Sequence, residues 1–154
     1  MLFVAAVALW SDAKVVPTDV EVAEKFVAAL NHGSTEDLVS AAGYPFVFRN
    51  QEWESAKDGS GFVHGKSYDK SFAKKKALRT FLKTLVTAVK IENEKAATNP
   101  PSKENLLLDN LKGSPAEWQR LNLILFGRGF GDVEHVAIIG VDSATHKVRG
   151  LYLN

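Results

Sequence analysis

The sequence predicts an α+β domain, with helices at its start and a mostly antiparallel sheet built from the strands that follow. Two short helical patterns separated by Gly33 come first, and an aromatic strand pattern begins directly after the second. The last third of the chain alternates strand patterns with short turns, as a meander does.

The composition is that of one globular domain. The chain has 154 residues, 45% hydrophobic and 24% charged, which is the usual balance for a domain that buries a core. We expect a single domain over residues 15–154, preceded by a separate segment at 1–14. The net charge of +1 does not favour nucleic acid as a partner. The absence of cysteine excludes disulfides, thiolate chemistry and cysteine-ligated metal sites.

Residues 1–14 leave two interpretations open. The run from Leu2 to Leu9 is apolar and small residues follow it, which resembles the end of a truncated secretory signal peptide. However, no Lys or Arg precedes the run, and the segment is shorter than the usual length of about 15 to 30 residues. The alternative is a strand or helix packed on the domain as an N-terminal extension. A secreted or periplasmic location is favoured over the cytoplasm, and no segment is long enough to span a bilayer.

Two capped helices open the domain. Thr18 and Glu21 form a capping box, in which each side chain can accept from the backbone N–H of the other. Apolar residues then recur at helical spacing until Gly33, which can adopt the left-handed conformation that ends a helix. A second, shorter helix is expected over residues 34–43.

A β-hairpin is predicted over residues 46–64. Pro45 lacks a backbone donor, which places it at the start of a strand or on an edge. The strand is expected to continue to Trp53, and Asp58-Gly59-Ser60-Gly61 supplies the turn. The longest helix is expected next, over about residues 70–90.

The remaining third contains a polar loop, a short helix and a meander. Residues 92–105 are interpreted as a loop, and Ser114 opens a capped helix that ends near Arg120. The strands of the meander are expected over residues 121–126, 133–141 and 148–153. The middle strand is apolar on both faces, so we expect cover on each side of it. The intervening 127–132 is interpreted as a glycine-rich hairpin turn or bulge, because no helix N-terminus follows it to hold a phosphate.

Four segments resemble the nuclear transport factor 2-like superfamily. VAEKFVAALNHGSTEDLVSAAG looks like its first two helices, YPFVFR like its first strand, FVHGK like its passage into the long helix, and EHVAIIGVDSATHKVRGLYLN like its closing hairpin. The resemblance covers about residues 18–154. It implies a curved, mostly antiparallel sheet wrapped around the N-terminal helices, a cone-shaped α+β barrel, and a homodimer through the open face of the sheet. Members range from isomerases and dehydratases to transport and scaffolding proteins, so the resemblance does not fix an activity.

The resemblance also implies a pocket inside the cone. We expect its lining to include Tyr44, Phe46, Phe48, Trp53, His135 and Tyr152, with Arg49 or Arg128 at the rim. Aromatic side chains with few polar groups suit a small apolar or aromatic ligand. The same side chains equally suit an ordinary filled core. No cofactor is expected.

His135 is the candidate catalytic residue. A buried neutral imidazole can act as a general base if Tyr44 or Tyr152 supplies the proton donor, as in an isomerase or dehydratase. The competing interpretation is a core or interface histidine bonded to the backbone. The inward aspartate that the family's enzymes pair with a tyrosine or a second acid is not found on the predicted strands. The four histidines show no metal-ligand spacing, so no metal site is expected.

A row of basic residues on the longest helix is the last candidate. Lys75, Arg79 and Lys83 line up at successive turns and could bind an anionic partner, or could form a solvated face. The sequence therefore favours a non-catalytic domain, dimeric, that binds a small ligand or serves as an accessory module. An acid–base enzyme using His135 and an interaction module using the basic helix remain the alternatives.

Overall fold

The computed structural model describes residues 16–130 and 134–154, so the predicted N-terminal segment lies outside the described residues. The elements are, in chain order, α1 (Asp19–His32), α2 (Thr35–Ala41), β1 (Ala42–Ser55), β2 (Phe62–Phe72), α3 (Lys75–Ala88), α4 (Lys103–Asp109), the 3₁₀ helix η1 (Ala116–Arg120), β3 (Asn122–Phe130), β4 (Glu134–Asp142) and β5 (Lys147–Leu153).

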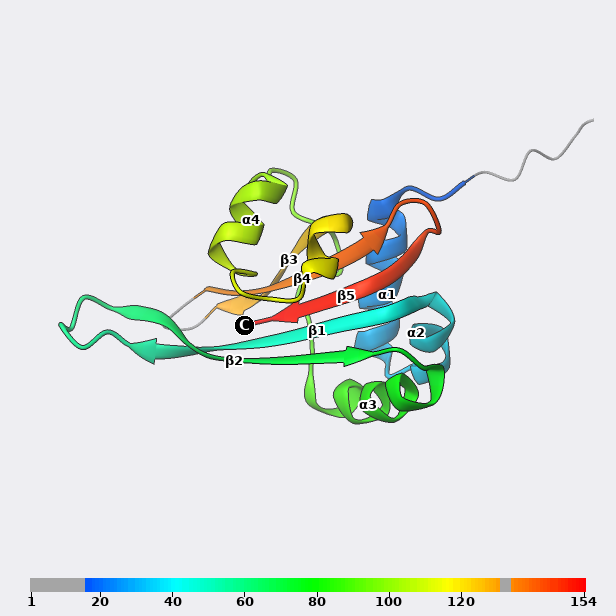
Figure 1. Cartoon of the computed structure of the whole chain (residues 1–154), viewed down its shortest axis with the longest axis horizontal. Coiled ribbons are helices and arrows are strands. Elements are labelled where there is room, and N and C mark those ends of the chain that lie inside the picture. Colours follow the sequence, from blue (N-terminus) through cyan, green and yellow to red (C-terminus); the bar gives the residue numbers. More distant parts are fainter. Residues whose placement is uncertain (1–15, 131–133) are drawn as a thin grey trace, which may run out of the picture.

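The five strands form one curved sheet in the order β2-β1-β5-β4-β3 (Figure 1). Neighbouring strands are antiparallel except β1 and β5, which are parallel. Within the described residues, β2 and β3 are the two edges of the sheet, so the sheet does not close on itself. The predicted α+β class, with a curved, mostly antiparallel sheet beside N-terminal helices, is confirmed, in the form of an open sheet.

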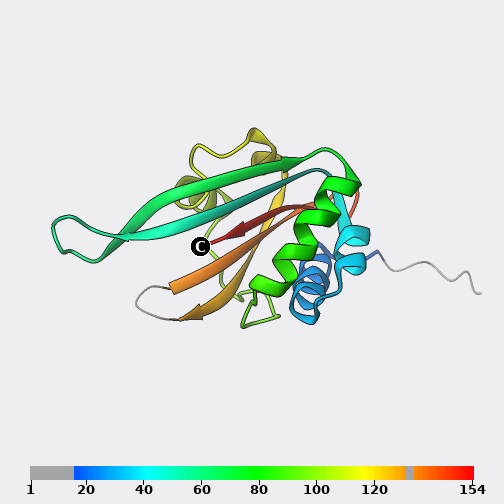
Figure 2. The same cartoon turned by 90° about the horizontal axis from the view of Figure 1, so that it is seen from below.

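Helices α1, α2 and α3 cover one face of the sheet, here called the inner face (Figure 2). Local signals set both ends of α1 as predicted, whereas Ser34 makes no side-chain cap on α2, and that helix ends at Ala41, before the predicted Gly43. Thr18 and Glu21 form the capping box, and Gly33 ends α1 with a φ of 75°. The layer between helices and sheet is apolar, and the ring of Phe26 lies 6.3 Å from that of Phe46. Burying such side chains stabilises a fold by roughly 1.5 to 3 kcal/mol each, so this layer is the main core.

A smaller apolar layer covers the opposite, outer face, where α4 and η1 pack. Trp118 of η1 is fully buried and its ring lies on Gly140 and Gly150, which are paired across β4 and β5. A Cβ at Gly150 would lie 2.6 Å from the indole ring, so only glycine leaves room for it. Strand β4 is therefore covered on both faces, as its apolar pattern predicted.

The hairpin is longer than predicted. The returning strand was expected to end at His64, but β2 continues to Phe72, and the hairpin extends beyond the body of the domain (Figure 1). Nearly every residue of β2 is exposed, because it is an edge strand that nothing covers. Because β2 has no buried face, its sequence lacks the alternation of apolar and polar residues that would predict a strand. Helix α3 accordingly starts at Lys75 and ends at Ala88, within the predicted 70–90.

Three further boundaries differ from the predictions. The loop expected over residues 92–105 ends earlier, because Ser102 caps α4 by accepting from the backbone N–H of Asn105. Ser114 does not cap a helix; its hydroxyl donates to the carbonyl of Leu111, and η1 is a single 3₁₀ segment. Strand β3 continues through a bulge at Gly127–Gly129, where a turn or bulge was expected.

Candidate ligand-binding groove

The aromatic residues predicted to line a cone divide between the two faces of the sheet. Phe46 and Phe48 point to the inner face and are buried, and the ring of Phe48 lies 4.8 Å from that of Phe81 on α3. Tyr44 is half-buried against the same core, and its hydroxyl has no hydrogen-bond partner among the described residues. Burial raises the pKa of Tyr44, so the hydroxyl stays protonated. At these three positions helices fill the inner face.

Trp53 and Tyr152 lie on the outer face, so the structure does not bring them together with Phe46. Side chains alternate along a strand, which places Trp53 on the same side of β1 as Val47. The bulge near Trp53 adds its extra residue to β2, so the alternation of β1 is unbroken. Tyr152 is fully buried under α4, and its hydroxyl donates to Asn110 Oδ1 at 3.3 Å. Grouping these two side chains with the inner-face aromatics was wrong.

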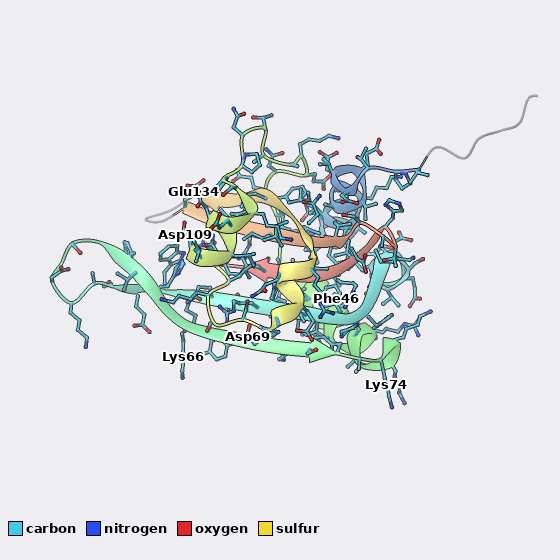
Figure 3. All side chains as sticks on the ribbon, turned by 45° about the horizontal axis from the view of Figure 1, so that its top comes forward. Phe46, Lys66, Asp69, Lys74, Asp109 and Glu134 are labelled. Carbon is cyan, nitrogen blue, oxygen red and sulfur yellow. The ribbon has the colours of Figure 1, made fainter. Side chains whose placement is uncertain are left out.

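The largest cavity described for the outer face is a groove of about 770 Å³, here called the outer groove. The β1–β2 hairpin forms one side of the groove and α4 another. Leu125 of β3 and the first residues of β4 form the remaining side. Its five largest apolar side chains come from five different elements: Trp53, Phe62, Leu106, Leu125 and Val136. Figure 3 labels Glu134, which lines the groove at the start of β4, and Asp109, the last residue of α4.

Polar groups at the outer groove are few and mostly amides. Asn99, Asn110, Glu134 and Asn154 supply them. The indole Nε1 of Trp53 is buried and has no hydrogen-bond acceptor among the described residues. The hydroxyl beneath the groove is also protonated, because burial raises the pKa of Tyr152 to about 12. The groove can therefore offer neutral hydrogen bonds and an apolar surface.

His135 and Arg128 line a second, smaller cavity of about 240 Å³ together with Gly129 and Asn154. The ring Nδ1 of His135 lies 3.1 Å from the main-chain oxygen of Asn154, which fits an imidazole that donates from Nδ1. Arg128 Nη1 donates to the same oxygen. Burial lowers the pKa of Arg128.

No described tyrosine completes an acid–base pair with His135. Leu153 pairs with Asn50 of β1 and with Ala137 of β4, so His135 is level with residue 52 of β1. Tyr44 is eight residues further along, roughly 26 Å away at about 3.3 Å per residue. Tyr152 points to the opposite face. The arrangement expected for an isomerase or dehydratase is thus not assembled from these residues.

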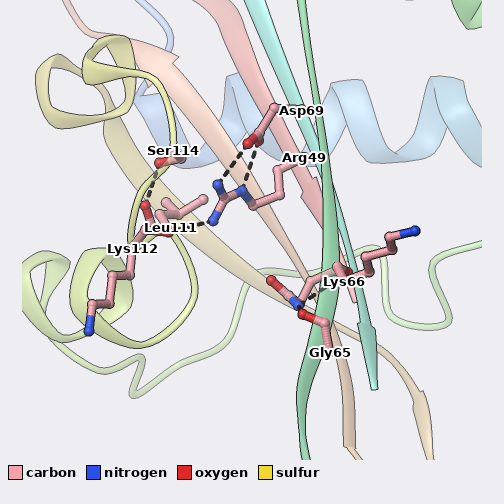
Figure 4. A network of polar contacts seen from close by, with 8 residues as sticks. Arg49, Gly65, Lys66, Asp69, Leu111, Lys112 and Ser114 are labelled. Carbon is pink, nitrogen blue, oxygen red and sulfur yellow. Dashed lines mark hydrogen bonds and ion pairs between the residues drawn. The ribbon is translucent and has the colours of Figure 1, made fainter. Parts of the chain in front are cut away.

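Arg49 is a buried structural residue and does not stand at a pocket rim. Its guanidinium makes two hydrogen bonds of 2.8 Å to the carboxylate of Asp69 and donates to the carbonyl of Lys112, also at 2.8 Å (Figure 4). It is 3% exposed. The ion pair ties β1 to β2 and to the turn after α4, so it positions the outer layer.

The basic residues of α3 are exposed, as an anionic partner would need. Lys75 and Lys83 carry no ion pair among the described residues, whereas Arg79 pairs with Glu36 of α2 at 2.9 Å. Figure 3 shows Lys66 and Lys74 pointing away from the body along the β2 edge. Of the three predicted basic residues, Lys75 and Lys83 are thus unpaired among the described residues, and Arg79 links α3 to α2 through its ion pair with Glu36.

Two features are absent from residues 16–130 and 134–154. No group of three or more His, Asp and Glu side chains there could hold a metal ion. No helix in that part of the chain has the length and apolar character needed to cross a membrane.

Comparison with known proteins finds likeness to solved structures alone. No protein-family model and no curated protein matches the sequence. Among solved structures, the chain is similar to an NTF2-like protein of unknown function from Cytophaga hutchinsonii, with 9% sequence identity, a TM-score of 0.43 and 92% of each chain covered. The description of that structure names no activity.

Proposed function

We propose that this domain is a non-catalytic binding or accessory module that holds a small apolar or aromatic group in the outer groove. One observation carries the proposal: the groove combines five large apolar side chains with a small number of neutral amides and the indole N–H of Trp53, which has no acceptor among the described residues. Its volume of about 770 Å³ lies in the range of small-molecule sites, about 300 to 1,000 Å³.

The distribution of titratable groups supports a binding role over a catalytic one. His135 donates to the main-chain oxygen of Asn154 and lies on the other face of β4 from the groove residue Val136. General acid–base catalysis needs a proton donor or acceptor within hydrogen-bond reach of the substrate. Of the groove's described lining, only Glu134 has an acidic or basic side chain, and it is exposed at the start of β4.

Titration with 8-anilinonaphthalene-1-sulfonate tests the proposal, because this dye brightens in apolar sites. We expect saturable binding to the wild type, and at least about tenfold weaker binding to Leu125→Glu, which puts a charge into the groove. Val20→Glu adds the same charge at a 41% exposed position on α1 and serves as the matched control. Equal dye binding by all three proteins would refute the groove as the site.

The proposal includes a homodimer through the outer face, with α4 as part of the contact. Because α4 and η1 already cover the centre of that face, a second copy must touch α4, whose Leu108 is 60% exposed. Sedimentation velocity of the wild type and Leu108→Glu tests this. A concentration-dependent dimer that Leu108→Glu converts to monomer is expected, and a monomeric wild type at all concentrations would remove this part.

A further inference from the structure

The net charge of the chain conceals a strongly basic segment. Residues 66–90 hold eight Lys and Arg side chains and one acid, Asp69, a net charge of +7 against +1 for the whole chain. The carboxylate of Asp69 is paired with Arg49, and Arg79 is paired with Glu36. The lysines of β2 and of the first turn of α3 make no ion pair among the described residues. Most of the positive charge is therefore available to a partner.

Part of this charge forms a row that contains an aromatic ring. Lys66, Tyr68 and Lys70 alternate along β2, so their side chains share one face, and Lys74 follows between β2 and α3. Lys66 Nζ lies 5.9 Å from the centre of the Tyr68 ring, and Lys70 Nζ lies 5.3 Å from that of Phe81 on α3. Tyr68 is 43% exposed. We call Lys66, Tyr68, Lys70 and Lys74 the β2 row; Figure 3 shows its two end residues pointing away from the body on the same side.

The β2 row lies on the opposite side of the hairpin from the outer groove. Lys70 is paired with Phe48, which points to the inner face. Glu52 and Glu54 of β1 also point to that face by alternation, nearer the tip of the hairpin. The basic surface therefore ends at Lys66, and it is a second surface, separate from the groove.

Two simpler explanations of these lysines leave part of the row unexplained. Lysine on an edge strand opposes pairing with another sheet, which accounts for Lys66 and Lys70. It does not account for Tyr68, because an exposed ring makes an edge more adhesive. Stability of α3 does not account for Lys74 and the two lysines after it, because the positive end of the helix dipole favours acids and the first turn contains none.

A ring flanked by cations suits a single-stranded nucleic acid. In such sites basic side chains meet the phosphates and exposed aromatic rings stack on the bases. The Cα of Tyr68 lies about 6.6 Å along the strand from those of Lys66 and Lys70, at about 3.3 Å per residue. A duplex keeps its bases stacked on one another, and an anionic membrane offers the lysines a partner but gives the ring no base. The single strand is the partner that uses both chemical groups of the row.

We propose that the β2 row binds single-stranded nucleic acid. Lys66 and Lys70 pair with phosphates on either side of one nucleotide, and the base of that nucleotide stacks on Tyr68. Lys74 pairs with a further phosphate. None of these contacts reads the edge of a base, so binding should show little sequence preference and a strong dependence on salt.

Fluorescence anisotropy with labelled single strands of about 12 thymidines or 12 uridines, on the full chain, tests the charge. We expect saturable binding at about 50 mM salt. Lys66→Gln/Lys70→Gln should weaken it at least about tenfold and reduce the slope of log K against log salt by about 1.4, since each lost phosphate contact accounts for about 0.7. Lys112→Gln/Arg120→Gln removes the same charge from exposed positions of the outer layer, and should bind like the wild type.

Substitutions of Tyr68 test the stacking separately. Tyr68→Leu keeps an apolar side chain without the ring and should weaken binding about tenfold, whereas Tyr68→Phe keeps the ring and should bind like the wild type. Neither should change the salt slope, because no cation is lost. If sedimentation velocity shows that the double lysine variant self-associates, the two Tyr68 variants still decide the question.

The inference is overturned if the wild type binds neither oligonucleotide, or if Tyr68→Leu binds as tightly as the wild type. It is also overturned if the control pair loses as much affinity as the variant pair. Binding to phosphatidylserine vesicles without binding to either oligonucleotide would overturn it too, and would identify a membrane surface as the partner. Binding of either oligonucleotide with the expected variant effects supports it, and the ratio of the two affinities distinguishes DNA from RNA.

Discussion

The inner and outer faces of the sheet are covered by segments of different length and origin. Three helices of the first 88 residues cover the inner face, and their aromatic and aliphatic side chains fill it. The outer face is covered by the seven-residue α4 and the five-residue η1, which leave the end near the hairpin uncovered. The fourteen-residue helices α1 and α3, together with the shorter α2, fill most of the inner face, whereas α4 and η1 cover a patch of the outer face and leave a groove beside it. The outer face therefore has the more open surface on which a ligand could bind.

The largest expected stability effect is on the inner face. Phe26→Ala removes a fully buried ring that stacks on Phe46, and should lower the free energy of unfolding by about 3 to 5 kcal/mol. Urea unfolding followed by circular dichroism measures it. Trp53→Ala, at the half-buried edge of the outer groove, should cost clearly less. Similar losses at the two positions would break the distinction between a filled face and an open one.

The next effect tests how tightly the outer layer is seated. Gly150→Ala would put a Cβ 2.6 Å from the Trp118 ring, and overpacking of this kind costs about 1 to 3 kcal/mol. Gly59→Ala, in the hairpin turn, has open space around it but a φ of 72°, so it reports backbone strain alone. Thermal unfolding of both variants separates the two causes. An unchanged Gly150→Ala protein would mean that Trp118 does not pack on the sheet as described.

The smallest expected effect on stability is at Glu24 of α1, whose carboxylate accepts hydrogen bonds from Lys95 and Ala96 in the loop after α3. The hydrogen bond from Lys95 holds the pKa of Glu24 below its usual value, with the backbone N–H of Ala96 adding to it. A carboxyl with a lowered folded-state pKa contributes stability above its unfolded pKa, and this contribution is lost as the pH falls through the folded value. Relative to Glu24→Gln, the wild type should therefore be more stable at pH 7, and the difference should shrink below about pH 4.5. Lys95 is exposed, so added salt should reduce the difference.

The inner face could be predicted from sequence because its signals are local. The capping box at Thr18, the left-handed Gly33 and the apolar stripe of α1 act within a few residues of each other. The opposite facing of Val136 and Ala137 could likewise be read from alternation, and it is confirmed. These features need no knowledge of which distant segment packs against them.

The outer groove could not be predicted, because it depends on where separate segments meet. Leu106 lies in an apolar triplet that is too short to predict as a helix, and nothing in the sequence indicates that α4 packs beside β4. Phe62 was assigned to a strand, but its place in the groove follows from the length and curvature of the hairpin. The facing of Trp53 could have been predicted from alternation. Trp53 lies six residues after Val47 on β1, so the two side chains share one face and Phe46 points to the other.

Mapping a bound apolar probe by NMR tests the central claim most directly. With 8-anilinonaphthalene-1-sulfonate added to the isotope-labelled protein, the account predicts that the signals of Trp53, Leu125 and Val136 shift on binding while those of Phe46 and Phe48 stay in place. Shifts confined to Phe46, Phe48 and their helix partners would show that the inner face holds the open site, and would contradict the account.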